Sequence, residues 1–454
     1  MHERFRLPTI DRSLLISTAA LILGVAMWSA NAEQPLVADG VVPPESYAIH
    51  GQFTYVEQET DAFHSPYIGP NSLSPSIGRE TFDATLILGA RFWRGAEGWL
   101  NPEVDQGFGL DNTLGLAGFP SGEAYKVGRK RPYLRLPRAF VRQTVNLGEP
   151  TERVDAAANQ LDGTRSADRV VITVGKFGVG DVFDTSQYAH DPRGDFLNWA
   201  AVDAGSFDYA ADAWGFTVGA AVEWYQGPWV LRGGVFDLSN VPNSEHLGSG
   251  GHQFQMIVEL ERRIEVNAQP GRVAVTTYDS RARMGLLNDA VARAAATGGV
   301  VDVSAVRSYR SRTGIHVLAE QQLTADLGTF IRVGGASGNV ESYEFTDIDR
   351  AVEAGLSLKG ARWSRPLDTV AAAALLNSIS SARERYLNAG GLGILVGDGQ
   401  LRNARSEQIL EVYYNAAVSR ALSITADFQR VEHPAYNADR GPVSVMAIRV
   451  HGQF

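Results

Sequence analysis

Polar side chains of mixed type recur on one face of successive strand-like segments of this sequence. Sugar hydroxyls both donate and accept hydrogen bonds, so Arg, Glu, Asn and Gln can each pair with them, while aromatic rings cover the flat face of a sugar ring. An ion-selective pore would more simply use rings of one charge. The set favours contact with a hydroxyl-rich solute, although an ion pair between neighbouring strands would explain any single member. The members are Arg91, Arg138, Arg142, Glu223, Gln253, Gln255, Glu259, Glu411, Asn415, Asp427 and Arg449.

Residue types that serve enzyme catalysis are present but are not arranged for it. None of the nine histidines is paired at the spacing of a zinc-binding helix. The chain has no cysteine, so disulfides and thiolate chemistry are excluded. Despite 47 glycines, no Gly-x-Ser-x-Gly elbow or phosphate-binding glycine loop occurs at a strand-to-helix junction. The sequence therefore predicts a protein that is not an enzyme.

Acidic residues are concentrated between Asp181 and Asp212. Loop carboxylates of this kind could bind Ca²⁺, but their spacing does not match an EF-hand. We expect solvated loop acids paired with Arg193 instead, so no cofactor is predicted and Ca²⁺ remains the less favoured alternative. The seven aspartates are 181, 184, 191, 195, 203, 208 and 212.

The polar faces require strands to position them, and the stretch Glu407 to Phe454 has the pattern of three consecutive strands. Leu410, Val412 and Tyr414 alternate with polar residues such as Glu411. A period of two indicates a strand with unlike faces and a well-specified register. The polar face carries acids, amides and arginines strand after strand, which is typical of a water-filled barrel interior.

Similar segments recur along the chain and predict an all-β fold, a transmembrane antiparallel β-barrel of about 16 strands with short helices in its loops. Fifteen strands are recognised, and an even number is expected, with the missing strand near Leu110 to Phe119 or Asn198 to Ser206. Short turns alternate with long loops, as in outer-membrane barrels. Besides the last three, the predicted strands are Tyr47 to Gln58, Thr81 to Arg94, Glu97 to Val104, Leu134 to Leu147, Arg169 to Phe177, Ala211 to Tyr225, Pro228 to Asp237, His252 to Ile264, Arg272 to Tyr278, Gly314 to Thr324, Gly328 to Gly335 and Ala351 to Gly360.

The segment Ala211 to Tyr225 places large apolar residues on one face and small or polar residues on the other. Trp214 and Trp224 lie on the apolar face ten residues apart, and ten strand residues span about 33 Å. This spacing predicts two interfacial aromatic girdles, with packing in a soluble core as the alternative. Two alanine-rich stretches, Ala282 to Ala296 and Leu367 to Leu387, have helical spacing and are expected in loops that cap or narrow the lumen, or that are simply exposed.

The first 32 residues have the composition of a secretory signal peptide. Arg4, Arg6 and Arg12 precede an apolar run that ends at Ala30-Asn31-Ala32. We predict a signal peptide over 1–32, a flexible leader over 33–46 and a single barrel domain over 47–454. Removal of three basic and two acidic residues changes the formal net charge from −10 to −11. This acidic balance argues against nucleic acid as a partner.

Motifs spread over most of the chain resemble those of the carbohydrate-selective porin family of Gram-negative outer membranes. This resemblance implies a sixteen-stranded barrel through which glucose and other monosaccharides diffuse, with loops folded inward as a constriction. Phe454 is similar to the terminal aromatic residue that serves as an assembly signal. The motifs are Gly51-Gln-Phe-Thr54, Asn101-Pro-Glu103, Gly115-Leu-Ala-Gly-Phe119, Arg138-Ala-Phe-Val-Arg-Gln143, Gly175-Lys-Phe177, Tyr188-Ala-His-Asp-Pro-Arg193, Phe196-Leu-Asn-Trp199, Phe207-Asp-Tyr-Ala-Ala-Asp212, Phe345-Thr-Asp-Ile-Asp349, Trp363-Ser-Arg-Pro366, Ala389-Gly-Gly391, Tyr413-Tyr414 and Gly441-Pro-Val443.

The resemblance places candidate sugar-binding residues at a pore constriction, on or next to strands and in one matched loop. The stretch Gly148 to Ala167 departs from the family pattern. The predicted partners are monosaccharides and outer-membrane lipid, with monomer or trimer undecided, and the predicted location is the bacterial outer membrane after export through the periplasm. A general or ion-selective porin, or a barrel with enzymatic or adhesive loops, are the alternatives. The candidate site residues are Arg91, Glu97, Asn101, Glu103, Arg138, Arg142, Asn198 and Trp199.

Overall fold

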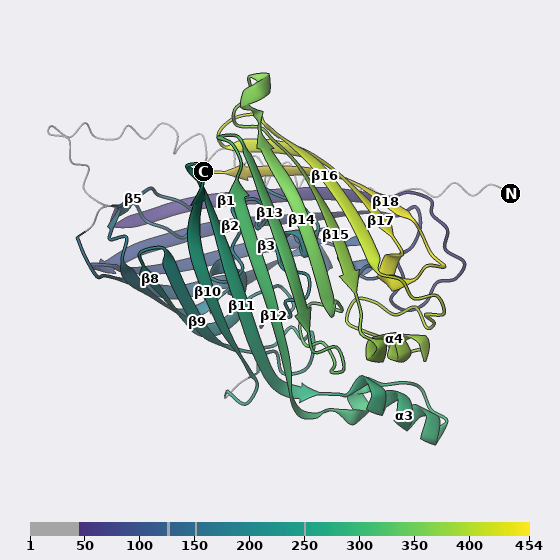
Figure 1. Ribbon diagram of the computed structural model, residues 1–454. Helices are drawn as coiled ribbons and strands as arrows, with labels where there is room; N and C mark the ends of the chain where they lie inside the picture. Colours follow the sequence, from purple (N-terminus) through teal and green to yellow (C-terminus); the bar gives the residue numbers. More distant parts are fainter. Residues whose placement is uncertain (1–44, 125–127, 150–151, 249–250) are drawn as a thin grey trace. The chain divides into compact units, whose positions relative to one another are not determined.

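The chain forms one closed antiparallel β-barrel of sixteen strands (Figure 1). The computed structural model describes residues 45–124, 128–149, 152–248 and 251–454, so the predicted signal peptide and nearly all of the leader lie outside the described residues. β1 (Tyr47–Thr60) pairs with β2 on one side and with β18 on the other, which closes the sheet. Closure leaves no unpaired strand edge, and only such a sheet can cross a bilayer.

Each barrel strand pairs with its neighbours in chain order, and a separate two-stranded hairpin of β5 (Glu152–Val154) and β6 (Gly163–Arg165) lies outside the barrel sheet. The other strands are β2 (Gly78–Trp93), β3 (Ala96–Gly107), β4 (Arg129–Asn146), β7 (Arg169–Phe177), β8 (Thr217–Gln226), β9 (Trp229–Asp237), β10 (Phe254–Val266), β11 (Gln269–Met284), β12 (Ser308–Gln322), β13 (Leu327–Ala336), β14 (Arg350–Lys359), β15 (Thr369–Ser378), β16 (Glu407–Ala417), β17 (Leu422–Glu432) and β18 (Val443–Gln453).

All fifteen predicted strands are confirmed, and the sixteenth is β15 (Thr369–Ser378). The predicted helix Leu367 to Leu387 is wrong over its first half, because only α4 (Ser381–Asn388) is helical there. The strand contains four consecutive alanines, which favour a helix and hide the alternation. The suggested positions for a missing strand, near 110–119 and 198–206, are also wrong, since they hold loops with the short helices η1 (Leu110–Asn112) and α2 (Trp199–Val202).

The barrel is apolar outside and polar inside, the reverse of a water-soluble protein. On β16 the outward Leu410 is 48% exposed, whereas the inward Glu407 and Glu411 are fully buried. Outward apolar residues recur on the other strands, and the exposed aromatic residues Trp93, Trp224 and Trp229 lie near the short turns. Apolar side chains this exposed on sixteen strands are typical of the outer face of an outer-membrane barrel.

Trp214 does not belong to an aromatic girdle, so this part of the prediction is wrong. β8 begins at Thr217, so Trp214 and Phe216 precede the strand and line the interior, whereas Trp224 faces outward and is 45% exposed. Gly215 has a φ of +98°, and this left-handed backbone interrupts the alternation before the strand begins.

The two ends of the barrel differ in the length of their connections. At one end most strands are joined by short turns such as 227–228, and at the other lie long loops such as 178–216 and 379–406. α3 (Leu287–Thr297) and α4 belong to this second end, and Figure 1 shows both beyond the strand ends. Outer-membrane barrels keep short turns on the periplasmic side, which we use to name the ends. No helix in the described ranges is long and apolar enough to cross a membrane.

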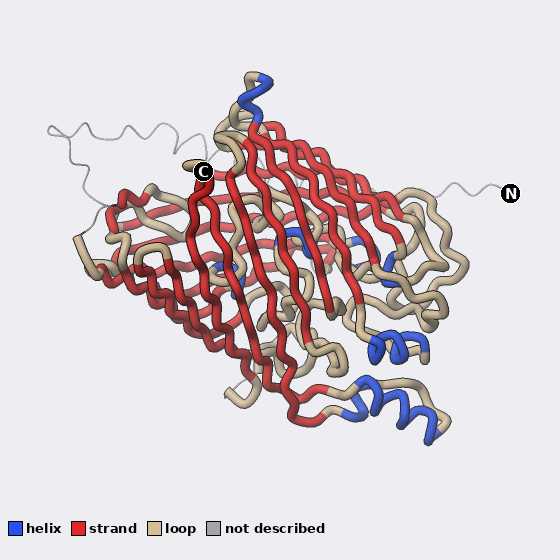
Figure 2. Tube along the Cα trace, viewed as in Figure 1, coloured by secondary structure: helices blue, strands red, loops and turns tan. Residues whose placement is uncertain are grey.

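Loops fold into the lumen, and Figure 2 shows tan segments between the strands of the barrel. Carboxylates on the inner wall hold these loops by accepting backbone N–H groups. Glu407 accepts from Ala117 and Gly118 at 3.0 and 2.8 Å, and Glu411 accepts from Leu197 at 2.5 Å. Charged acceptors make stronger hydrogen bonds than neutral ones, so the acids of the wall fix where the loops lie.

Candidate substrate site in the barrel lumen

A cavity of about 250 Å³ lies between the wall at β4 and the inward-folded loops 108–124 and 178–216. Strand β4 contributes Arg135 and Arg138, which point inward. The loops contribute acids, one arginine and several aromatic rings. The principal lining residues are Phe119, Glu123, Arg135, Arg138, Asp181, His190, Asp191, Arg193, Trp199, Asp203, Tyr209, Trp214, Phe216 and Phe345.

Aromatic rings and guanidiniums form one side of this cavity. Trp214 donates its Nε1–H to the Tyr133 hydroxyl at 2.9 Å. The guanidiniums of Arg135 and Arg138 lie 5.3 and 4.8 Å from the ring centre of Phe216. Cation–π contacts and the indole hydrogen bond hold these rings in place. Trp214 and Phe216 remain partly exposed, which leaves aromatic surface for a flat apolar face of a solute.

Ion pairs orient both arginines of β4. Arg138 binds Asp181 through two parallel hydrogen bonds of 2.8 and 2.6 Å. Arg135 contacts Glu103 at 2.5 Å and also pairs with Asp105. Burial acts to raise the pKa of Asp181, but the Arg138 guanidinium outweighs it and lowers the pKa below its usual range. Asp181 therefore stays ionised and keeps Arg138 in place.

Arg193 lies among four carboxylates, and its backbone N–H donates to Asp191 Oδ1 at 2.9 Å. Its nitrogens are 3.5 Å from Asp83 and Glu123, 3.8 Å from Glu103 and 3.9 Å from Asp191. Burial acts to lower the pKa of Arg193, but Glu123 and Asp83 outweigh it and raise the pKa well above the usual value.

Four residues that line this cavity carry a buried polar atom without a hydrogen bond. Among the described residues these atoms are Glu123 Oε2, His190 Nδ1, Arg193 Nε and Trp199 Nε1, and the two charged ones belong to Arg193 and Glu123. A charged donor and a charged acceptor thus remain available next to the aromatic rings. Hydroxyl groups can satisfy both, because a hydroxyl donates and accepts.

The sequence profile of the carbohydrate-selective porin, OprB family, matches residues 78–454. The chain belongs to the carbohydrate-selective porin family. It is a sugar-selective porin of the Gram-negative outer membrane, and fold and family indicate a channel rather than an enzyme.

One solved porin structure shares the fold of this porin at low sequence identity, and a second is less similar. Pseudomonas putida OprB, in a structure at high pH, is 18% identical with a TM-score of 0.68, over 90% of this chain and 94% of that chain. The outer membrane channel DcaP of Acinetobacter baumannii is 9% identical with a TM-score of 0.49, over 90% of this chain and 97% of that chain. No curated protein sequence matches this porin.

Four of the predicted site residues lie at or next to the cavity of this porin. Arg138 and Trp199 line it. Asn101 on β3 is paired with Arg138 on β4. Glu103, also on β3, accepts a hydrogen bond from the cavity residue Arg135. Trp199 is only 3% exposed, because its ring lies between Phe119 and Phe345 with centroids 5.4 and 6.3 Å away.

The other four predicted site residues lie elsewhere. Asn198 is fully buried and caps α2, and its side-chain amide donates to Gly118 O and Gln429 Oε1. Arg91, Glu97 and Arg142 lie toward the short-turn end, where they face the connection between β4 and β7. The structure therefore divides the predicted set between two places in the barrel.

Several cavity residues were not among the predicted set. Arg135 points inward although strict alternation from Arg138 would turn it outward. The pairing of β4 with β3 is irregular at Pro137, and this irregularity changes which side chains point inward. Arg193 ends one of the matched family motifs and could have been chosen on that ground. Glu123, Trp214 and Phe216 lie in loops without a period, so their position depends on tertiary contacts.

Most aspartates of the segment 181–212 are buried and bonded to protein groups, so the expected solvation is wrong for them. Asp184 pairs with Arg332 at 3.1 Å, and Asp212 pairs with Lys176 at 2.9 Å. Asp208 accepts three backbone N–H groups of residues 343–345. These three are buried, and no group of three possible metal ligands occurs within the part of the chain that the structure describes.

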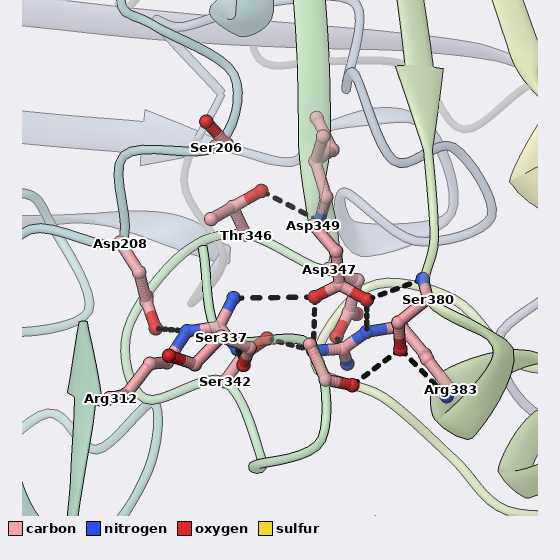
Figure 3. Close-up of polar contacts among 12 residues, drawn as sticks. Ser206, Asp208, Arg312, Ser337, Ser342, Thr346, Asp347, Asp349, Ser380 and Arg383 are labelled. Atoms are coloured by element: carbon pink, nitrogen blue, oxygen red, sulfur yellow. Dashed lines mark hydrogen bonds and ion pairs between the residues drawn. The ribbon is translucent and has the colours of Figure 1, made fainter. Parts of the chain in front are cut away.

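A buried ionic network fixes the long loops where they enter the barrel (Figure 3). Arg383 of α4 pairs with Asp347 and Asp349, each at 3.0 Å. Arg312 of β12 pairs with Asp208 at 3.2 Å and with Asp349 at 3.5 Å. All five side chains are at most 2% exposed. The network thus joins three loops, 178–216, 337–349 and 379–406, to the wall.

Proposed function

We propose that this porin lets neutral monosaccharides, glucose among them, diffuse passively across the outer membrane through the cavity beside β4. The observation that carries the proposal is the pairing of aromatic surface on Trp214 and Phe216 with the unsatisfied donor of Arg193 and acceptor of Glu123. At about 250 Å³ the cavity is smaller than the ~300 Å³ at which pockets for drug-sized ligands begin. That size favours one sugar ring over a chain of them.

In this proposal a sugar exchanges its hydration shell for protein groups at the narrow part of the channel. Its ring lies against Trp214 and Phe216, Arg193 donates to a hydroxyl oxygen, and Glu123 accepts a hydroxyl proton. Binding must stay weak and fast, because a tightly held solute would block the path of the next. Ion pairs that already neutralise the arginines limit the attraction to any one solute.

Sugar-dependent closure of single-channel current in a planar bilayer tests this function. Glucose should reduce the current in a saturable way. A current that stays unchanged at high glucose would contradict the proposal. Liposome swelling separates the alternative of a general porin, since a general porin admits sugars and amino acids of similar size at similar rates, whereas a sugar site favours the sugars.

Replacing the cavity tryptophan, Trp214→Ala, should weaken glucose closure roughly 3- to 10-fold, because an aromatic contact contributes about 0.5–1.5 kcal/mol beyond its buried area. The measurement is the half-closing glucose concentration, which is the concentration that gives half of the maximal reduction of the single-channel current. Trp224→Ala, which removes a ring from the outer face of β8, is the matched control and should leave that concentration unchanged. Equal effects of the two variants would mean that the cavity ring does not contact sugar.

The remaining proposals concern the surroundings of the barrel. We propose that the exposed apolar outer face contacts outer-membrane lipid, supported by exposed residues such as Leu134, Val174 and Ile315 at 72, 52 and 53%. We further propose that residues 1–32 direct export to the periplasm before membrane insertion, supported by the charge and apolar pattern of that segment.

A further inference from the structure

The connection between β4 and β7 is longer than the geometry of the barrel requires. Leu147 N donates to Asp168 O at 2.9 Å, and Asn146 is paired with Arg169, so the strand ends are already adjacent. A two-residue turn can join antiparallel strands at such a point. The chain instead places twenty residues, 148–167, between them, whereas the other connections at this end have between two residues (227–228) and nine (360–368).

The tip of this connection, residues 157–163, turns inward beneath the lumen and is bonded to the inner wall. Arg91 of β2 donates to Asp162 O at 2.8 Å, and Arg142 of β4 donates to Asn159 O at 2.8 Å. Asp162 and Glu45 exchange two further hydrogen bonds, of 3.0 and 3.1 Å, at the start of β1. The tip is thus held by charged donors on β2 and β4 and by Glu45, which precedes β1.

Leu161 anchors the same tip by apolar contact. It is 1% exposed and belongs to the buried apolar cluster that includes the inward-facing Ala48, Ile87, Trp99 and Phe140. Those four residues come from β1, β2, β3 and β4, so the leucine is buried in the same apolar cluster as the inner wall of these strands. A leucine in this position occupies cross-section that a short turn would leave to water.

We infer that residues 157–163 form a second constriction at the periplasmic end of the channel, in series with the cavity beside β4. The central cavity recognises a sugar by hydrogen bonds and aromatic contact. The periplasmic constriction, built from Leu161 and the backbone of Asn159 and Asp162, restricts solutes by size. The periplasmic constriction therefore sets an upper limit on the size of the solutes that leave the channel. This limit applies to sugars and to other solutes alike.

Replacement of residues 148–167 by Asn-Gly tests this inference, because it keeps the strand pairing and removes the constriction. The open-channel conductance should rise, and the ratio of disaccharide to monosaccharide swelling rates should increase at least roughly twofold. The half-closing glucose concentration should stay at the wild-type value, which separates this inference from the sugar site at the central cavity. An unchanged conductance and an unchanged swelling ratio in a barrel that inserts normally would overturn it.

A second variant keeps the full length of the chain, so it tests the inference even if the replacement of residues 148–167 causes a folding defect. The double variant Arg91→Met, Arg142→Met removes the two charged donors that hold the tip, and its conductance should rise or fluctuate more than that of the wild type. Arg129→Met, at the opposite end of β4, is the matched control and should conduct as the wild type does. If the conductance of the double variant and its fluctuations equal those of the control, the tip does not obstruct the channel.

Discussion

The variant Arg193→Met is expected to lose most of the sugar-dependent closure. Methionine keeps much of the side-chain volume but removes a guanidinium that lies within 3.9 Å of Asp83, Glu103, Glu123 and Asp191. A hydrogen bond from a charged donor contributes about 1.5–3 kcal/mol, so glucose binding should weaken roughly 10- to 100-fold. The uncompensated carboxylates should also increase the preference for cations, measured as the reversal potential in a salt gradient.

The conservative variant Arg193→Lys separates charge from geometry. Lysine restores the positive charge but not the planar fork of donors, so ion selectivity should return toward the wild-type value while sugar closure stays weak. Thermal unfolding of the purified barrels controls for misplacement of the loop 178–216. If Arg193→Met folds normally and closes at the wild-type glucose concentration, the sugar site is not beside this arginine.

The strands of the barrel could be predicted from the sequence because each of them has an apolar outer face and an inner face of different composition. Leu410 and Val412 alternate with Glu407 and Glu411 for that reason alone, and the register follows from the pattern. β15 lacks the alternation of apolar and polar residues, because its inner face packs against loops and is not exposed to water. Ala371 and Ala373 point inward and are buried, so both faces of this strand carry small apolar residues.

The interior of the lumen could not be predicted in the same way, because loops follow no period. Glu411 has the inward position that a pore-lining acid would have, yet it binds the backbone of Leu197 and Asn198 and holds a loop. Trp214 has the spacing of an interfacial ring, yet it lies before the strand begins. In both residues a long-range contact decides the role, and alternation reports only which side of the wall a residue faces.

The predicted site residues show the same limit. Arg138 and Arg142 are four residues apart on one strand and both point inward, so the sequence gives no reason to separate them. The structure places one at the cavity and the other against the segment 148–167. That segment was the one stretch that departed from the family pattern, and its fold determines what Arg91 and Arg142 contact.

The variant Arg383→Met is expected to loosen the loops that narrow the channel. It leaves Asp347 and Asp349 buried without their closest guanidinium, and breaking a buried ion pair from one side costs about 3–5 kcal/mol. Loops 337–349 and 379–406 should then become accessible to proteases, and the single-channel current should become noisier. Arg385→Met on the exposed face of the same helix removes only a contact to Asn288 and should leave both properties unchanged.

The acid sensitivity of this network gives a second measurement on the same variant. Burial acts to raise the pKa of Asp349, but Arg383 and Arg312 outweigh it and lower the pKa from 3.8 to about 2. Because the folded pKa is depressed, the stabilisation is complete above about pH 4 and is lost as the pH falls toward 2. Wild-type loops should therefore resist an acid-active protease down to about pH 3. In Arg383→Met one of the two cations is gone, so the reduced protection that these loops keep at neutral pH should be lost about one pH unit higher. Identical pH profiles for wild type and variant would mean that Asp349 does not hold the loops.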